Sequence, residues 1–503
     1  MVLTAPTDSC PPSSPVWARR YNVTRASRRR FLLVASFIIC LGSVLAFFRF
    51  YETSETLVDP SRLLLPVSDP VPPSDFPNNI NNTNTTINNS TLPPSHDQYL
   101  PISLRPETYV RGKPTAHFRD SLRDDVKYMT SFLGAGFTND QITLGNLIYL
   151  SKISGRVPVL PPLTSHIDAQ KDPLDFSRIF DLPRLTRESG IPILEWSMIK
   201  DLDRAWSEGV VDELGCWNIW QRQDITADGP RRTYTSELLK LDLSHTLAPG
   251  WVKLIPNFEH DKHSTFWTLA KLLFPAARAS ALADPAEHPT LPAHSGARLP
   301  PDEQMGCIDY LYYTCAQEAL DFAQDYSPMW RDVMTHAHWT PEVARLGASL
   351  VRATLAPHAP RTSPPPPFIA LHARHGDFAQ YCDPAGPRGA CFAPLSAFAA
   401  EVERVRDAHA ARTGVRVEHV VMTSDERDPG WWAEVAAMGW HRVDVGAART
   451  PAGFGEWWPV IADAVVQSMA VGFVGTEDST FSLAAKRRVE EWNGGEVAMV
   501  KWR

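Results

Sequence analysis

The stretch FIALHARHGDF, residues 368–378, places a short apolar run directly before a cluster of ring-bearing and charged side chains. Its first part, Phe368 to Leu371, is apolar at every position, as in a strand that is buried on both faces of a parallel sheet. Open α/β sheets bind ligands just beyond the carboxyl ends of their strands. The stretch therefore predicts an α/β fold with a binding site where this strand ends.

Apolar runs alternate with helical periodicity on both sides of this stretch, which is the pattern of α/β layers. Downstream we expect strands at 417–422 and 472–475, with a helix over roughly residues 460–470. Upstream, strands at 126–132 and 157–160 enclose a helical stretch and form one βαβ unit. The chain is therefore predicted to hold two Rossmann-like domains that face each other across a cleft.

Two breaks in this pattern indicate how the globular part is organised. Residues 356–367 end in four consecutive prolines and mark a boundary between the two halves. A segment rich in Ala, Pro and His at 279–304 has the composition of a surface insertion. We therefore predict an N-terminal domain over 106–360 and a C-terminal domain over 361–503.

The first 50 residues predict a membrane anchor. Phe31 to Phe48 carries no charge and follows the triplet Arg28 to Arg30. A helix of this length spans about 27 Å, which suits the thinner membranes of the early secretory pathway. A cleaved signal peptide would need a shorter apolar run and a small-residue cleavage site, and a buried core helix would leave the arginines unexplained. The positive-inside rule then makes 1–30 a cytosolic tail and 31–50 a single-pass type II anchor of the Golgi or endoplasmic reticulum, with everything after it in the lumen.

Residues 51–105 are expected to form a disordered stem, because they are rich in Pro, Ser, Thr and Asn and offer little to bury. Four patterns for N-linked glycosylation crowd into this stem, at Asn81, Asn84, Asn88 and Asn89. Their place on the lumenal side of a predicted anchor favours modification. The alternative is an Asn-rich tract that carries no sugar.

Five cysteines follow the anchor, in a compartment where disulfides can form. Cys382 and Cys391 flank a loop rich in Pro and Gly and are the simplest pair to bridge. Cys216, Cys307 and Cys315 cannot all pair, so one free thiol is expected. The sequence does not give the connectivity.

A glycine-containing turn, Gly134 to Asn139, follows the first predicted strand. Glycines there would let backbone N–H groups approach an anionic ligand at the start of the next helix. A purely structural turn from strand to helix would have the same sequence. The turn alone does not decide between these two interpretations.

Arg374, just beyond the strand at 368–371, has the planar fork of donors that suits a diphosphate. Such a group can absorb the charge that develops on a departing nucleotide. Asp377 lies three positions later, so a local ion pair that only orders the loop is the equal alternative.

A third stretch, FVGTEDSTFS at 473–482, ends a predicted strand and begins a helix with hydroxyl residues. Ser479 could act only as an N-cap, which is the commoner role of such a residue. The same geometry also makes a phosphate cradle, because free amides and hydroxyls point the same way at a helix start.

Together these stretches resemble the GDP-fucose O-fucosyltransferase superfamily, which includes α-1,6-fucosyltransferases. The resemblance covers roughly 109–503, with a poorly matching middle at 168–360. Residues 136–162 look like the first motif of that family, His372 to Phe378 like its His-x-Arg-x-Gly-Asp motif, and 463–482 like its last motif. The three motifs occur in the order and at the relative spacing of the family.

This resemblance implies a GT-B fold in which the second domain holds most of the donor, GDP-fucose. It also implies inversion at the anomeric carbon without a bound metal or other cofactor, and it assigns residues to the cleft. Those residues are Gly136, Phe137, Thr138, Asn139, His372, Ala373, Arg374, Asp463, Ser479, Thr480 and Phe481. Arg374 would meet the diphosphate and Asp463 the nucleoside. The acceptor, a protein or a glycan, is left open by the poorly matching middle.

An inverting transfer also needs a general base that takes the proton of the acceptor. Asp140, directly after the glycine-containing turn, is a candidate. The alternative is an acid favoured at a helix start by the macrodipole. Thr423-Ser424-Asp425 resembles a further strand end of the family, without a definite role.

Other classes of protein fit the sequence less well. The formal net charge of −8 argues against a nucleic-acid partner. A metal-dependent GT-A transferase would place an Asp-x-Asp at a strand end, whereas Asp201-Leu202-Asp203 lies in a stretch that reads as an amphipathic helix. An inactive relative that only binds its ligand is the last alternative, and the presence of Arg374 disfavours it.

Overall fold

The computed structural model describes residues 100–164, 172–224, 226–382, 391–443, 445 and 450–502. The predicted cytosolic tail, anchor and glycosylated asparagines lie outside these residues. Within the described ranges, no helix is both long and apolar enough to cross a bilayer. The folded part begins before the predicted end of the stem, because Leu100 is 2% exposed and its carbonyl accepts from Arg105 Nε at 2.8 Å.

Seven strands form the sheet of the N-terminal half, and all neighbours pair in parallel except β5 and β7. In sheet order they are β3 (Leu194–Glu195), β2 (Val157–Leu160), β1 (Tyr128–Ser131), β8 (Met305–Ile308), β4 (Asp212–Asn218), β5 (Leu241–Leu247) and β7 (Thr290–Leu291). The segment predicted as a surface insertion, 279–304, therefore supplies an edge strand. A strand of two residues has too short a pattern to be seen in the sequence.

Five parallel strands form the sheet of the C-terminal half. In sheet order they are β12 (His441–Arg442), β11 (His419–Ser424), β10 (Phe368–Ala373), β13 (Gly472–Thr476) and β14 (Glu496–Val500). The three strands predicted in this half are confirmed, but each ends one or two residues later than expected. The reason is that polar residues at the strand ends still pair with their neighbours, as His372 does with Thr423.

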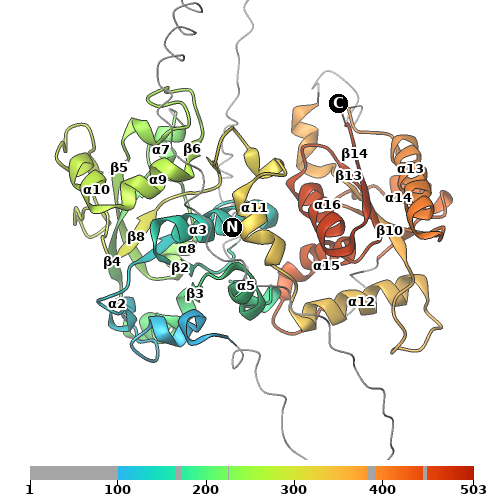
Figure 1. The fold of residues 1–503 in the computed structure, drawn as a ribbon, viewed down its shortest axis with the longest axis horizontal. Coiled ribbons are helices and arrows are strands. Elements are labelled where there is room, and N and C mark those ends of the chain that lie inside the picture. The colour runs from blue at the N-terminus through green and yellow to red at the C-terminus, as the bar shows by residue number, and fades with distance from the viewer. Residues whose placement is uncertain are drawn as a thin grey trace, which may run out of the picture. The chain divides into compact units, whose positions relative to one another are not determined.

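The helices alternate with these strands along the chain (Figure 1). Those of the N-terminal half are α2 (Phe118–Ser121), α3 (Phe137–Ser154), α4 (Phe176–Ile179), α5 (Leu182–Ser189), α6 (Leu202–Glu208), α7 (Trp220–Gln223), α8 (Thr235–Leu238), α9 (Phe266–Leu273), α10 (Pro275–Leu282) and α11 (Pro328–Asp332). Those of the C-terminal half are α12 (Pro341–Leu355), α13 (Leu395–Thr413), α14 (Pro429–Ala437), α15 (Trp458–Ser468) and α16 (Thr480–Asn493). Two short strands, β6 (Ser264–Thr265) and β9 (Thr314–Cys315), form a separate parallel pair.

Strand β10 has a different core on each of its faces, because successive side chains of a strand point to opposite sides. Phe368 and Ala370 join the apolar cluster that includes α15 and α16, whereas Ile369 and Leu371 join the cluster that includes α13. This burial on both faces explains why the strand is apolar at every position. It also sends the side chain of His372 toward α16.

The two halves share one apolar core. Met129 of β1 and Leu147 of α3 belong to the same cluster of buried side chains as Ile461 of α15 and Val489 of α16. Helix α16 starts from the second sheet and packs against α3 of the first half. The two sheets are therefore joined by continuous packing at this point.

Helix α12 belongs to the C-terminal half, although it precedes the predicted boundary at 356–367. It packs on α15, where Gly347 lies against Val465. The proline-rich segment is thus a connection inside the second half, and the structural boundary comes before Pro341.

Two disulfides are present among the described cysteines. Cys382 pairs with Cys391, which confirms the prediction for this loop. Cys216 of β4 pairs with Cys307 of β8 and links two neighbouring strands of the first sheet, and Cys315 is a buried thiol.

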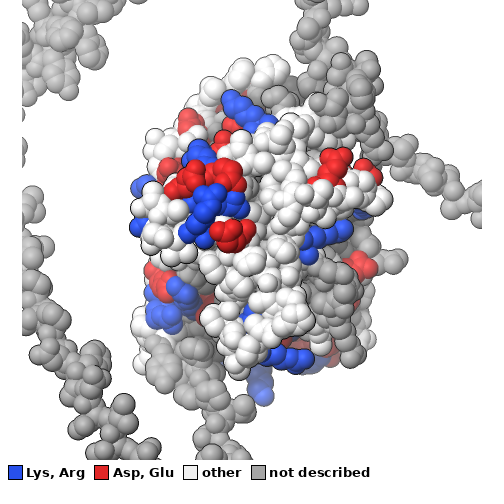
Figure 2. Space-filling view, turned by 90° about the vertical axis from the view of Figure 1, so that its right-hand side faces the viewer, with Lys and Arg blue, Asp and Glu red and all other residues white. Residues whose placement is uncertain are grey.

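Charged side chains on the outer side of the second half are mixed in sign. Figure 2 shows Lys and Arg beside Asp and Glu, with wide uncharged areas between them. Helix α13 supplies several such pairs, including Arg416 with Glu403 and Asp407. The described residues on this face therefore form no continuous cationic surface.

We predict that Gly347→Leu destabilises the fold by about 1–3 kcal/mol, because a Cβ at this position would already lie 2.8 Å from both methyl carbons of Val465. Ser349→Leu on the exposed side of the same helix is the matched control and should stay within about 0.5 kcal/mol of the parent. Denaturant unfolding of the two variants measures the difference. Equal stability would show that α12 and α15 are not packed as described.

Candidate active site at the carboxyl end of the second sheet

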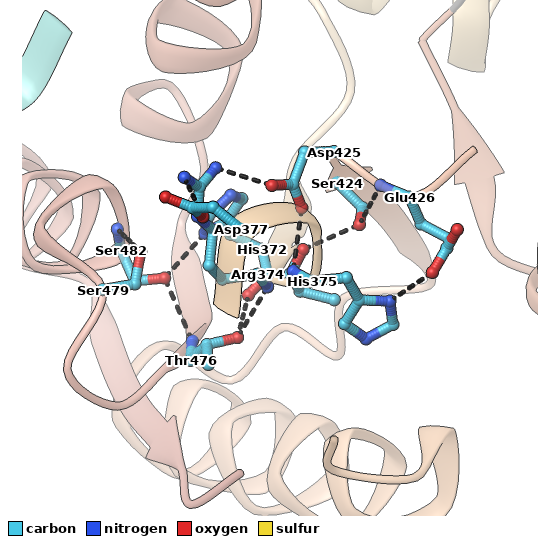
Figure 3. A network of polar contacts seen from close by, with 11 residues as sticks. His372, Arg374, His375, Asp377, Ser424, Asp425, Glu426, Thr476, Ser479 and Ser482 are labelled. Carbon is cyan, nitrogen blue, oxygen red and sulfur yellow. Dashed lines mark hydrogen bonds and ion pairs between the residues drawn. The ribbon is translucent and has the colours of Figure 1, made fainter. Parts of the chain in front are cut away.

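The carboxyl ends of β10, β11 and β13 lie side by side at one edge of the second sheet. His372 is in register with Thr423 of β11 and Gly475 of β13. Because the three strands are parallel, the loops that follow them leave from the same edge. Figure 3 shows the polar network that these loops form.

His372 is a buried, uncharged imidazole. Its Nδ1 lies 2.7 Å from Ser482 Oγ, and its ring centroid lies 5.0 Å from that of Phe481. Burial, with the nearby charges of Arg374 and His375, lowers the pKa of His372 to about 3. At neutral pH this residue can therefore donate or accept a hydrogen bond, but it does not carry a positive charge.

Thr476 ties the ends of β10 and β13 together. Its hydroxyl accepts from the Arg374 amide at 2.9 Å and donates to the His372 carbonyl at 3.0 Å. Its own amide donates to Ser482 Oγ at 3.0 Å. These three bonds fix the backbone on which the His372 and Arg374 side chains stand.

Arg374 is held between two carboxylates (Figure 3). Its Nη1 donates to Asp425 Oδ2 at 2.7 Å, and its Nη2 donates to Asp377 Oδ1 at 2.6 Å. The side chain is 30% exposed. The local ion pair with Asp377 that the sequence allowed is thus present, and a second pair, from another strand end, accompanies it.

Asp425 is the residue around which the loop after β10 folds. Its Oδ1 accepts from the His375 amide at 2.8 Å while its Oδ2 accepts from Arg374. Gly376 has a φ of +28°, and a Cβ there would lie 2.2 Å from Asp425 Oδ2, so only glycine fits. The sequence motif Thr423-Ser424-Asp425 indicated a strand end of interest, and the structure places its carboxylate at the centre of the site.

Asp463 lies on α15, near enough to Asp425 for the charges of the two carboxyl groups to interact. Burial raises its pKa to about 7, opposed by Arg442 and reinforced by Asp425. No hydrogen bond from a described residue reaches this carboxyl group. It is therefore an acceptor that a ligand could use.

The glycine-containing turn of the first half has a different internal structure from the one predicted. The amides of Gly134 and Ala135 donate to Asp140 Oδ1, at 3.3 and 3.1 Å, so they are not free for an anion. Phe137 begins α3 after Gly136, and no side chain caps this helix start. The amides that could meet an anion are therefore those of the first helical turn, as expected of an uncapped N-terminus.

Asp140 does not fit the predicted role of general base. Its side chain is 0% exposed, and burial raises its pKa well above the usual range, against the opposing amides of Gly134 and Ala135. Because neither oxygen reaches solvent, the carboxyl group does not face an acceptor. Its contacts show that it holds the turn.

The turn of the first half and the start of α16 meet at the site. Thr480 Oγ1 donates to Asn139 Oδ1 at 2.7 Å, although the two residues are 341 positions apart. Phe137 packs on Trp457, with a centroid distance of 6.2 Å. Asn139 and Thr480, two predicted cleft residues that are far apart in the sequence, are thus in direct contact.

Two other predicted residues have structural roles. Ser479 accepts from the Ser482 amide at 3.3 Å and is the N-cap of α16, as the commoner interpretation of its sequence predicted. Ala373 is buried in the core on the α13 side of β10, so its side chain points away from His372. Only the backbone of Ala373 borders the site.

Arg231 was missed by the sequence analysis. Its Nη2 donates to the Gly134 carbonyl at 2.7 Å, and its guanidinium lies over the rings of Trp220 and Tyr310, at 4.9 and 5.1 Å. The buried carboxylate of Asp309 accepts from the Arg231 backbone amide at 3.4 Å. No local pattern could reveal this residue, because its contacts come from other strand ends far away in the chain.

The Asp-x-Asp triplet of the GT-A alternative is part of a helix start. Asp201 caps α6 by accepting from the Arg204 amide at 3.0 Å, and Asp203 lies in the first turn. Across the described residues, no group of three His, Cys, Asp or Glu side chains has the arrangement of a metal site.

Several solved structures align with this chain at low sequence identity. POFUT1 in complex with GDP-fucose aligns with a TM-score of 0.47 and 12% identity, over 76% of this chain and 98% of that one. The fucosyltransferase NodZ from Bradyrhizobium aligns with a TM-score of 0.33 and 11% identity, over 72% and 93%. A mutant of Arabidopsis thaliana FUT1 in complex with GDP aligns with a TM-score of 0.33 and 10% identity, over 81% and 75%.

No family model matches the sequence, and no curated protein matches it.

We predict that Asp140→Ala destabilises the protein by about 1–3 kcal/mol, because two amides of the turn lose their buried acceptor. Asp140→Asn keeps a carbonyl oxygen in place and should lose less. Thermal unfolding of the two variants gives the comparison. If Asp140→Asn melts like the parent protein but loses several decades of turnover, Asp140 acts as a base after all.

Proposed function

We propose that the protein is a glycosyltransferase that moves fucose from GDP-fucose onto an acceptor hydroxyl. The observation that carries this proposal is the meeting of three distant motifs at one edge: Asn139 bonds Thr480, and His372 bonds Ser482. These are the stretches through which the sequence resembles GDP-fucose transferases. A fold could retain one such motif for packing alone, whereas the convergence of all three supports a common ligand.

Arg374 and the start of α16 are the groups that would receive the diphosphate. Arg374 provides a planar guanidinium fork, which binds phosphate oxygens in a bidentate manner. The Thr480 and Phe481 amides belong to the first turn of α16, where the helix dipole favours an anion. Together they would offset the charge of the leaving GDP without a divalent ion, so we propose a metal-independent reaction.

His372 would act as a neutral donor beside Arg374. The Ser482 hydroxyl already accepts from the Thr476 amide, so its own proton is available for His372 Nδ1. In that tautomer the imidazole proton lies on Nε2, on the side away from Ser482. A neutral Nε2–H can bond a phosphate oxygen, and the depressed pKa keeps it in this state at neutral pH.

Asp463 would recognise the guanine. The carboxylate can accept from the N–H groups on the donor edge of this base. Adenine lacks the exocyclic donor at the matching position and would leave the buried acceptor unpaired, at a cost of about 1–3 kcal/mol.

The reaction that follows is an inverting displacement. The acceptor oxygen attacks the anomeric carbon on the face opposite the diphosphate, the bond from that carbon to the diphosphate breaks, and the acceptor proton passes to a base. Asp140 is not proposed as that base, because it is buried. An inactive relative that only binds GDP is the alternative, and a turnover assay separates the two.

We further propose that the enzyme works in the lumen of the Golgi or endoplasmic reticulum, as a type II membrane protein. The support is the uncharged run at 31–48 after an arginine triplet, followed by glycosylation patterns. The disulfide between Cys216 and Cys307 agrees with an oxidising compartment.

We predict that Arg374→Ala lowers turnover of GDP-fucose by about a hundredfold to a thousandfold, the effect of removing a preorganised charge stabiliser. Arg374→Lys keeps the charge but not the fork and should rescue little. Steady-state kinetics with purified enzyme gives the comparison. Near-normal activity of the lysine variant would mean that the residue only orders the loop.

We predict that GDP binds in excess chelator, that ADP and UDP bind much more weakly, and that Asp463→Ala removes this preference. GDP affinity should also fall as the pH drops below about 7, because the raised pKa leaves Asp463 protonated there. Only one of its oxygens then accepts freely, while the other carries a proton that would face the N–H groups of guanine. Above that pH the carboxylate is free and the affinity levels off. Calorimetry from pH 6 to 8 is the measurement.

The Asp463→Ala variant is also the control for this pH series, since the phosphates of GDP titrate in the same range. Its profile should show the phosphate contribution alone. Loss of GDP binding in chelator, with recovery on adding manganese, would contradict the metal-independent site.

A further inference from the structure

The guanidinium of Arg374 is paired with two carboxylates, a charge balance that disfavours the approach of a diphosphate. In the structure one arginine faces two carboxylates, those of Asp377 and Asp425, at 2.6 and 2.7 Å. His372 next to it is uncharged and does not offset the second carboxylate. A diphosphate brought to this fork meets like charges directly beside its partner, and such contacts disfavour binding. Donor binding is therefore favoured when one of the carboxylates leaves the guanidinium.

The two carboxylates differ in how firmly they are held. Asp425 uses both oxygens, one for Arg374 and one for the His375 amide, and it stands at the end of β11. Gly376 lies directly against the Asp425 carboxylate, so the carboxylate has no room to move toward Gly376. Its side chain is 29% exposed.

Among the described residues, Asp377 has one hydrogen-bond partner. Its Oδ1 accepts from Arg374 Nη2, and its side chain is 59% exposed. It lies in a short 3-10 helix, Gly376–Tyr381, none of whose residues is buried. An exposed ion pair of this kind is worth little, about 0.2–1 kcal/mol, and a rotation about χ1 is enough to open it.

We propose that Asp425 is the residue that positions Arg374 for the departing diphosphate, whereas Asp377 occupies the Nη2 side of the fork in the free enzyme and is displaced by the donor. In the free enzyme the Asp377 carboxylate thus occupies the position that a phosphate oxygen takes when GDP-fucose binds. Asp425 stays in place and keeps the guanidinium plane fixed during the reaction. This assignment rests on the proposed function of the site.

The consequence is that neutralising the two carboxylates has opposite effects. Asp377→Asn removes the competing charge and should tighten GDP binding about two- to fivefold. Asp425→Asn leaves an amide oxygen for the His375 amide but loosens Arg374. It should lower kcat about tenfold to a hundredfold, the effect of misplacing a catalytic group by a small distance.

The experiment measures GDP binding by calorimetry and GDP-fucose turnover by steady-state kinetics, with melting temperatures to confirm folding. Asp407→Asn is the control for lost charge, since Asp407 is an exposed carboxylate of α13 that pairs with Arg416 beyond the end of this helix. This control should leave both quantities unchanged. A salt series adds a second readout, because the advantage of Asp377→Asn should shrink as ionic strength rises.

Each result decides the proposal. If Asp377→Asn binds GDP no more tightly than the Asp407→Asn control does, the proposal is wrong. This comparison does not depend on whether Asp425→Asn folds. Tighter binding with normal kcat in Asp425→Asn would reverse the two roles and overturns it equally. If the parent protein binds GDP and turns over GDP-fucose while the variants match the control, only this inference fails. If the parent protein binds no GDP, both this inference and the proposed function are wrong.

Discussion

Strand β10 lies between two parallel neighbours, and the rest of the site depends on this constraint. Parallel pairing brings the ends of β11 and β13 to the same edge as the end of β10, in a register that aligns His372 with Thr423 and Gly475. The Thr476 hydroxyl then bonds the backbone on either side of Ala373. A loop that leaves this edge has little freedom, so the charged side chains after β10 stand in fixed positions.

Burial determines the charge of each polar group at this edge. The enclosed imidazole of His372 is neutral, and the carboxyl group of Asp463 has a pKa near neutrality. The Arg374 side chain is 30% exposed, and its positive charge is balanced by the carboxylates of Asp377 and Asp425. Among the described residues, the site therefore presents one strong cation, one neutral donor and one carboxyl group that receives no hydrogen bond, and these are the groups on which the proposed nucleotide site rests.

The first half contributes to the same site through the start of α3. Asp140 and Arg231 hold the turn before this helix from opposite sides, by its amides and by a carbonyl. The turn then presents Asn139 to Thr480 of α16. Further along the same two helices, Gln141 accepts from Arg488 at 2.8 Å, in the core shared by both halves. The geometry of the site thus depends on the packing of α3 on α16.

Much of the second sheet could be predicted from the sequence, because a strand buried on both faces is apolar at every position. The strand starting at Phe368 is a feature of this kind. The helix at 458–468 was also predicted, to within two residues at each end. The proposed ligand-binding edge followed from the same pattern, since charged residues come directly after the strands. Arg374 was found in this way, whereas Asp463 lies within α15 and was assigned only through the resemblance of 463–482 to the last motif of the fucosyltransferase family.

What the sequence by itself determined is therefore the order of strands and helices, the apolar faces and the residues that stand at strand ends. Only the tertiary structure decided which of these residues touch: that Asp425 holds Arg374, that Asp140 is turned inward to the amides of Gly134 and Ala135, and that α12 belongs to the second half. The physical reason is the distance along the chain over which each kind of interaction acts. Periodicity and turn chemistry act over a few neighbouring residues, whereas an ion pair between strand ends or a helix packed across a boundary joins positions that no local pattern connects.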